Sequence, residues 1–263
     1  MDFRTPTTLG KTGIRVSRLG IGSGYGVPAA AVEKAYHEYG VNYLYWCLPL
    51  RYGMTAAIRH LAPAHRDKLV IAVTLFARRG RSVPVSVEKA LRKLRIDYAD
   101  VLLLAWHNRY PRASALEAAV KLKEQGRARC IVMSGHERQT FGEMAQRPDC
   151  PVDVFMVRYN AAHPGAETDV FPHLPQENRP GVIAYTATCW GKLLKHRKMP
   201  PGEQPLTAPE CYRFALTNPH VDVVLTGPKN KRQMNEALKT LDAGPLSADE
   251  MERTRRIGAY MHG

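Results

Sequence analysis

Eight short apolar runs separated by amphipathic segments are the feature that most limits the folds open to this chain. The runs are rich in Val, Ile, Leu and Tyr, as strands buried on both faces of a parallel sheet should be. They span residues 18–24, 42–47, 69–74, 100–106, 128–134, 153–159, 181–188 and 222–227. Between them, residues 86–96, 113–126 and 208–218 carry the apolar spacing of helices. This alternation predicts an α/β fold with one domain over residues 1–263, a (β/α)8 TIM barrel.

An open, doubly wound sheet is the structural alternative. That fold needs fewer strands and usually has a G-x-G-x-x-G phosphate turn after its first strand. The glycines of "GIGSGYG", at residues 20–26, simply alternate with other residues, and Pro28 soon follows. Because this spacing does not match the dinucleotide fingerprint, the sequence favours the barrel.

The composition argues against several classes of protein. The chain has no run of 18 apolar residues, so we expect no membrane-spanning helix. The opening "MDFRTPTTLGKTG" has no apolar stretch of the kind found in secretory signals. The five cysteines show no C-x-x-C spacing, so neither a disulfide framework nor a metal site is expected. Together these features favour a cytoplasmic protein.

The net charge of +14 is concentrated in part in three basic clusters, at residues 77–81, 195–198 and 229–232. They follow the third, seventh and eighth predicted strands, and in a barrel such loops all lie on the C-terminal face. We therefore expect a small anionic ligand or a dinucleotide there, recognised through phosphate or carboxylate groups. Nucleic acid is a less favoured partner, since the chain has no RRM, KH or zinc-finger pattern.

The order of these segments resembles that of the aldo-keto reductases along nearly the whole chain. "LGKTGIRVSRLGIGS" is similar to the opening of that family, where a β-hairpin covers the barrel floor before the first strand. "GVNYLYW", "IDYADVLLLAW" and "GVIAYTA" are similar to the second, fourth and seventh strands. "VVLTGPKNKRQMNEAL" is similar to the eighth strand with its cofactor helix. The resemblance implies a TIM barrel with an N-terminal hairpin and an NADPH-linked carbonyl reductase.

The catalytic positions of that family are largely replaced. Its members use Asp, Tyr, Lys and His, and the tyrosine is the general acid whose proton loss the lysine eases. Tyr52 matches the tyrosine, whereas Thr74 and Ala105 stand at the lysine and histidine positions. Counting from Gly40 puts Tyr45 at the aspartate position, and counting back from Tyr52 puts Cys47 there. General acid–base groups contribute about 10²–10⁴-fold each, so the resemblance implies a degenerate site whose ordinary chemistry is lost or altered.

Several residues are candidates to substitute for the missing groups. His107 lies two residues beyond Ala105 and so has the same strand parity, but a solvated loop histidine is the favoured interpretation. Cys47 is either a reactive thiol or a buried, inert one. Tyr45 and Tyr52 either donate hydrogen bonds to a ligand or pack with solvated hydroxyls.

The cofactor positions are partly retained. Ser134 matches a serine that holds the nicotinamide amide, but Gly135 and Met156 replace the asparagine and glutamine that help it. Tyr185 matches the tyrosine that stacks on the nicotinamide ring. The resemblance assigns the phosphate and adenine contacts to Lys229, Asn230, Lys231, Arg232, Gln233 and Glu236. NADPH is therefore an expected cofactor, and two functions stay open: an altered reductase, or a non-catalytic pseudoenzyme that binds an anionic ligand or a protein partner.

Overall fold

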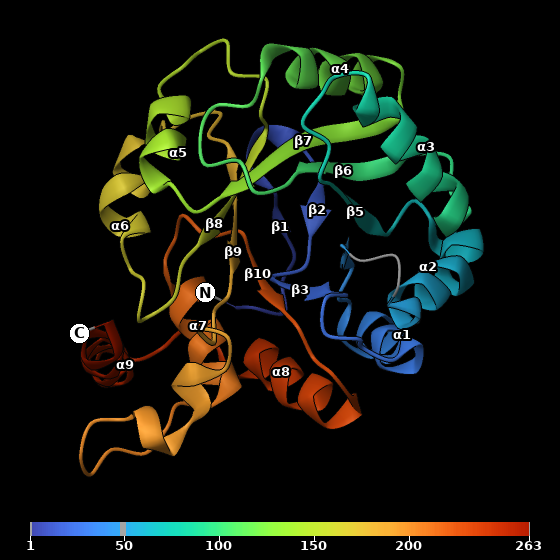
Figure 1. Ribbon diagram of the computed structural model, residues 1–263. Helices are drawn as coiled ribbons and strands as arrows, with labels where there is room; N and C mark the ends of the chain where they lie inside the picture. The colour runs from blue at the N-terminus through green and yellow to red at the C-terminus, as the bar shows by residue number, and fades with distance from the viewer. Residues whose placement is uncertain (1, 48–50, 263) are drawn as a thin grey trace.

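The computed structural model describes residues 2–47 and 51–262 and contains a closed barrel of eight parallel strands (Figure 1). The neighbours around the barrel run in the order β10-β3-β4-β5-β6-β7-β8-β9, and every neighbouring pair is parallel. The strands are β3 (Leu19–Gly22), β4 (Tyr43–Trp46), β5 (Val70–Leu75), β6 (Ala99–Leu104), β7 (Ala128–Gly135), β8 (Val154–Arg158), β9 (Gly181–Tyr185) and β10 (Val223–Thr226). The predicted (β/α)8 barrel is confirmed.

Helices cover the outside of this barrel, each following the strand that precedes it in the chain (Figure 1). They are α1 (Ala29–Tyr39), α2 (Tyr52–His65), α3 (Ser82–Leu94), α4 (Ala113–Glu124), α5 (Arg138–Ala145), the short α6 (Ala166–Asp169), α7 (Ala208–Thr217) and α8 (Lys231–Ala243). A last helix, α9 (Ala248–His262), lies beside α7. None of the described helices is both long enough and apolar enough to cross a membrane.

The predicted element boundaries agree with the structure to within a few residues. The largest difference is the helix expected over 86–96, since α3 already begins at Ser82. The run 181–188 is also shorter than expected, because β9 ends at Tyr185 and Thr186 has a left-handed φ of 57°. The helix predicted over 113–126 ends at Glu124, and Gly126 follows with a φ of 69°. Both ends coincide with backbone conformations that a strand or a helix cannot continue through.

The N-terminal hairpin of β1 (Thr7–Thr8) and β2 (Arg15–Val16) packs its apolar side chains into the barrel floor. Leu9, Ile14 and Val16 belong to the same buried cluster as the inward-facing strand residues. At Gly10 the backbone approaches β9 so closely that a Cβ would lie 2.1 Å from the Gly181 nitrogen. The hairpin therefore closes the floor, and the other end of the barrel is left as its mouth.

The floor is also held by aspartates at the starts of three strands. Asp100, Asp153 and Asp222 each accept a hydrogen bond from a backbone N–H of the preceding strand, at 2.8–2.9 Å. The donors lie on β5, β7 and β9, so the junctions β5/β6, β7/β8 and β9/β10 are held in the same way. These carboxylates fix the register of the strands they join.

Each of these carboxylates is also paired with a base at the outer edge of the barrel. Asp100 is fully buried and contacts both Arg66 at 2.8 Å and Arg129 at 3.0 Å. Asp153 pairs with Lys123 at 2.7 Å, and Asp222 pairs with Arg179. A buried carboxylate is tolerated only when charges and hydrogen bonds compensate for its lost hydration.

We expect Asp100→Ala to lower the free energy of unfolding by about 3–5 kcal/mol, because it leaves two arginines and a strand N–H without their partner. Asp149→Ala is the matched control, since its carboxylate pairs with Arg147 at an exposed site and should leave stability nearly unchanged. Urea unfolding of both variants measures the difference. Equal stabilities for the two would contradict a structural role for the floor carboxylates.

Candidate functional site

The inward-facing side chains at the C-terminal strand ends form a ring at the barrel mouth. Alternate residues of each strand point into the barrel, as the interior cluster with Tyr43, Ala72 and Met156 shows. The next inward position along each strand therefore lies at the mouth. On six of the eight strands these positions are Tyr45 on β4, Thr74 on β5, Ala105 just after β6, Ser134 on β7, Arg158 on β8 and Tyr185 on β9.

Tyr45 and Thr74 form a neutral contact on this ring. Burial raises the pKa of the Tyr45 hydroxyl well above its usual range, and the Cys47 thiol acts in the same direction. The Thr74 hydroxyl acts weakly in the opposite direction, but it makes no hydrogen bond of ordinary geometry within the described part of the chain. Neither side chain carries a charge at neutral pH, so Tyr45 is a weaker acid here than in water.

Cys47 lies beside the end of β3. Its sulfur is 3.3 Å from the Ser23 hydroxyl, and its backbone N–H donates to the same hydroxyl at 3.0 Å. Ser23 is itself fully buried. The cysteine is therefore half-buried against the barrel wall.

Tyr52 does not join the ring, although the resemblance groups it with the catalytic positions Tyr45, Thr74 and Ala105. It begins helix α2, its side chain is 68% exposed, and the Lys93 ammonium of α3 lies 5.5 Å from its ring centroid. The next residue, Gly53, packs so tightly on the Val27 carbonyl that a Cβ would lie 2.0 Å from that oxygen. That contact fixes the start of α2 against the loop after β3, and Tyr52 lies in the helical layer.

Arg78 holds the loop that follows β6. Its guanidinium donates to the Ala105 carbonyl at 2.6 Å, to the Trp106 carbonyl at 2.9 Å and to His107 Nε2 at 2.9 Å. This loop is strained, because Trp106 has a φ of 57°. One residue of the basic cluster at 77–81, Arg78, therefore holds the loop after β6 in place at the barrel mouth.

His107 is buried, with 8% of its surface exposed, and is not the solvated loop histidine that the sequence favours. Since Arg78 donates to Nε2, this nitrogen is an acceptor and the proton is on Nδ1. Burial, followed by the charge of Arg78, lowers the pKa of His107 to about 4. The ring is neutral at neutral pH and has no proton to give as an ordinary imidazolium acid.

The same loop explains why glycine stands at position 135. Ser134 accepts the Trp106 N–H at its hydroxyl, at 3.1 Å, and the His107 N–H at its carbonyl, at 2.7 Å. A Cβ on Gly135 would lie 2.0 Å from the His107 carbonyl oxygen. The loop therefore occupies the space that a side chain at 135 would need, and the Ser134 O–H remains able to donate into the mouth.

Tyr185 is tied across the mouth to the end of β7. Its hydroxyl donates to the Gly135 carbonyl at 3.1 Å and lies 3.0 Å from His136 Nδ1. Because the hydroxyl donates its only proton to Gly135, it must accept a hydrogen bond from His136. The neutral His136 ring therefore carries its N–H proton on Nδ1. Burial raises the pKa of Tyr185 to about 12, and the charge of Arg158 opposes this shift. The ring is held in one orientation between β9 and β7.

Arg158 is the mouth residue that sequence reasoning missed. It ends β8 and pairs in register with Tyr185 on β9. Its Nε is buried and has no hydrogen-bond partner among the described residues. The alternation Val154, Met156, Arg158 was the signal in the sequence, because it continues the inward-facing parity of β8.

Backbone strain also concentrates in the loop after β9. Thr186, Cys189 and Trp190 have φ values of 57°, 49° and 54°. A positive φ is a genuine outlier for a β-branched residue such as Thr186. Asn160 holds this loop by donating to the Thr186 carbonyl at 2.9 Å. Such strain is commonest at functional sites, and here it lies at the same face as Arg158 and Tyr185.

The predicted phosphate-binding residues lie at the start of α8. Asn230 caps the helix by accepting the Gln233 N–H at 3.0 Å, and the Gln233 side chain accepts the Lys229 N–H at 2.8 Å. Lys231 and Arg232 are exposed and form no ion pair with any residue that the structure describes. Glu236 is paired on the helix surface with Lys239 at 2.7 Å.

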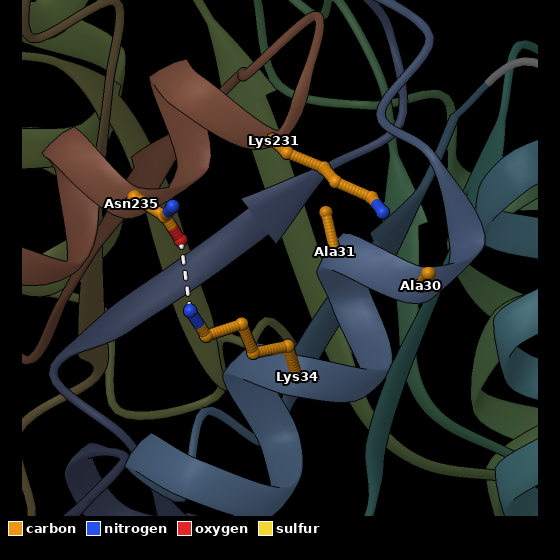
Figure 2. A pocket seen from close by; sticks show the side chains of 5 residues that line it. All are labelled: Ala30, Ala31, Lys34, Lys231 and Asn235. Carbon is orange, nitrogen blue, oxygen red and sulfur yellow. Dashed lines mark hydrogen bonds between the residues drawn. The ribbon is translucent and has the colours of Figure 1, made fainter.

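A cleft of about 250 Å³ lies between α1 and α8, next to these residues (Figure 2). It is lined by Ala30, Ala31, Lys34, Lys231 and Asn235. The Lys34 ammonium donates to the Asn235 side chain at 3.3 Å, and the Lys231 side chain reaches from α8 toward α1 (Figure 2). The cleft is basic and has small residues on one wall, which suits an anionic group.

The three basic clusters do not border one groove, contrary to our expectation. Residues 195–198 lie in a segment that projects beyond α7, away from α1 and the start of α8 (Figure 1). The connection that follows is anchored to α9, where Arg253 and Arg256 pair with Glu203. The ion pairs with α9 hold this part of the chain at the periphery. Among the described residues, no group of His, Cys, Asp and Glu side chains could hold a metal ion.

The pH dependence of stability tests the buried state of His107. The unfolded chain takes up a proton near the ordinary pKa of histidine, about 6.5, and the folded His107 does so only near 4. Its contribution is therefore present above pH ~6.5 and is lost as the pH falls toward ~4. His163, whose pKa is also lowered to about 4 by burial, contributes in the same sense.

We expect His107→Gln, which keeps an acceptor for Arg78, to weaken the fall in unfolding free energy between pH ~7 and ~4.5. Urea unfolding at several pH values measures this slope for both proteins. An identical slope in the two would show that His107 titrates normally in the folded protein.

Comparison with known proteins agrees with this architecture. Residues 52–210 match the family model described as the aldo/keto reductase family. The apo form of aldo-keto reductase AKR11C1 from Bacillus halodurans superposes with a TM-score of 0.78 at 19% identity, covering 96% of this chain and 95% of that one. Its holo form gives 0.79 at 18% identity and covers 96% of both chains. No curated protein matches the chain in sequence. Since the family model spans more than half of its length, this chain belongs to the aldo/keto reductase family.

Proposed function

We propose that this protein is an aldo/keto-reductase-family oxidoreductase that binds NADPH and reduces carbonyl compounds only slowly, without the ordinary proton relay. Membership of the family supports the NADPH-linked class of reaction. The residues at the mouth support a slow rate of carbonyl reduction, because Thr74 and Ala105 stand where the family pattern has a lysine and a histidine. The alternative is a barrel that binds an anionic ligand or a protein partner without turnover.

The neutral contact of Tyr45 with Thr74 is the observation that carries the proposal. In the family pattern a lysine stands at the position of Thr74 and an aspartate at the position of Tyr45 or Cys47, and the ammonium eases proton loss from the catalytic tyrosine. Here burial makes Tyr45 harder to deprotonate, and no ammonium on β5 offsets that effect. A phenol without such help is a poor proton donor to a carbonyl oxygen at neutral pH.

Tyr52 gives this conclusion a second support. The Lys93 ammonium of α3 makes a cation–π contact with the Tyr52 ring and lies in the helical layer. Among the described residues, no hydrogen bond joins the Tyr52 hydroxyl to Tyr45, Thr74 or His107. The tyrosine of the family motif is therefore separate from the mouth ring.

The described residues fit the phosphate end of NADPH well and the nicotinamide end in part. Lys229, Lys231 and Arg232 offer uncompensated positive charge at the start of α8. At the mouth, the oriented Tyr185 ring and the Ser134 hydroxyl suit the nicotinamide group. Met156 cannot supply the amide of the family glutamine. Bound NADPH would supply the hydride, while this chain would supply the binding surface and a weak proton donor.

We expect NADPH to bind, and to bind more weakly as salt rises, because the phosphate contacts are exposed. The double variant Lys231→Met/Arg232→Met should weaken binding about a hundredfold or more, since it removes two charged contacts to phosphate and each is worth about 1.5–3 kcal/mol. The double variant Lys89→Met/Arg92→Met on α3 removes the same number of charges from exposed positions and should not change the affinity. Titration followed by NADPH fluorescence measures all three proteins. The assignment of the phosphate contacts to α8 is contradicted if the α8 double variant binds NADPH as tightly as the unmodified protein, or if the control loses as much affinity as the α8 double variant.

Turnover with simple aldehydes and quinones should stay below ~1 s⁻¹ at saturating NADPH, the low end of ordinary enzymes. Consumption of NADPH in a substrate screen measures it. A faster rate would show that another group donates the proton, and Tyr45→Phe and Cys47→Ala would then identify it. Absence of any NADPH binding would favour the non-catalytic alternative.

A further inference from the structure

Arg158 places a positive charge inside the barrel mouth. It is the last residue of β8, and its side chain has the inward parity of Val154 and Met156. On one side it pairs in register with Tyr185, and on the other side His136 follows the last paired residue of β7. The hydrogen-bonded pair of Tyr185 and His136 therefore brackets Arg158 from the two neighbouring strands.

The guanidinium has no protein partner among the described residues. Its Nε is buried without a hydrogen bond, and no carboxylate forms an ion pair with it. Other partly buried arginines of this barrel differ in this respect. Arg66, Arg179 and Arg213 pair with Asp100, Asp222 and Glu250 at their own sites.

The groups around Arg158 do not balance its charge. Burial first, and the charge of Arg158 second, lower the pKa values of His136 and His163. Both rings are therefore neutral at neutral pH. Tyr185 is likewise neutral. A guanidinium cannot escape the cost of burial by losing its proton. An unpaired charge in such a partly buried site costs free energy, and an anion from solution would compensate it.

We propose that the mouth is an oxyanion-binding site anchored by Arg158, and that the carbonyl compounds this protein accepts carry a carboxylate or phosphate group. Arginine binds both groups through two parallel N–H donors. The Ser134 hydroxyl on β7 offers a further donor at the same rim. The anion site stands on the geometry of Arg158 alone, whereas the statement about substrates rests on the proposed reductase function.

Three matched probes test the site by calorimetry: 4-formylbenzoate, 4-formylphenyl phosphate and neutral 4-methylbenzaldehyde. The two anions should bind the unmodified protein more tightly than the neutral probe. Arg158→Met should lower the affinity for both anions by about ten- to a hundredfold and leave the affinity for the neutral probe unchanged. Arg158→Lys, which keeps the charge but loses the planar pair of donors, should lie between. The preferred anion distinguishes a carboxylate source from a phosphate source.

Two further measurements separate this proposal from a structural role and from the cofactor. Arg158→Met should be at least as stable to urea as the unmodified protein, because it removes an unpaired charge and keeps the apolar stem. NADPH affinity should not change in this variant. A destabilised variant with unaltered anion binding would overturn the site, and weaker NADPH binding would assign Arg158 to the cofactor. If the anions bind as expected but NADPH does not, the anion site stands and the reductase function fails.

Discussion

The carboxylates at the barrel floor are the interaction on which the rest of this structure depends. Asp100, Asp153 and Asp222 each join a strand to the one before it and each pair with an outer base. Asn42 joins β3 and β4 in a comparable way, accepting the Ser17 N–H at 2.8 Å. Alternate strand junctions are therefore held at one level. Because strand register is set at the floor, every inward side chain at the mouth is set as well.

Charge is used differently at the two ends of the barrel. At the floor, each carboxylate is matched by a base, which is the arrangement expected where burial must be stable. At the mouth, Arg78 is used to bind loop carbonyls, and Arg158 has no partner among the described residues. This contrast agrees with the general division of TIM barrels, in which the N-terminal face serves stability and the C-terminal face serves binding and chemistry.

The replacements at the mouth form a consistent packing arrangement. Tyr45 and Thr74 are neutral neighbours on the mouth ring. The loop after β6 brings the His107 carbonyl against Gly135. This loop position requires glycine at residue 135, because a side chain there would collide with that carbonyl. Arg78 in turn holds that loop and keeps His107 neutral. These contacts pack the mouth residues against one another and leave Tyr45, Thr74 and His107 uncharged at neutral pH.

The order of eight strands and helices and the family resemblance were determined by the sequence itself, since periodicity and spacing depend on near neighbours in the chain. The tertiary structure alone decided which side chains meet. It placed Tyr52 beside Lys93, buried His107 under Arg78 and joined the 200–210 connection to α9. It also left Arg158 at the mouth without a partner in the part of the chain that the structure describes. Side-chain direction and charge compensation depend on residues far apart in the chain, and only strand closure brings those residues together.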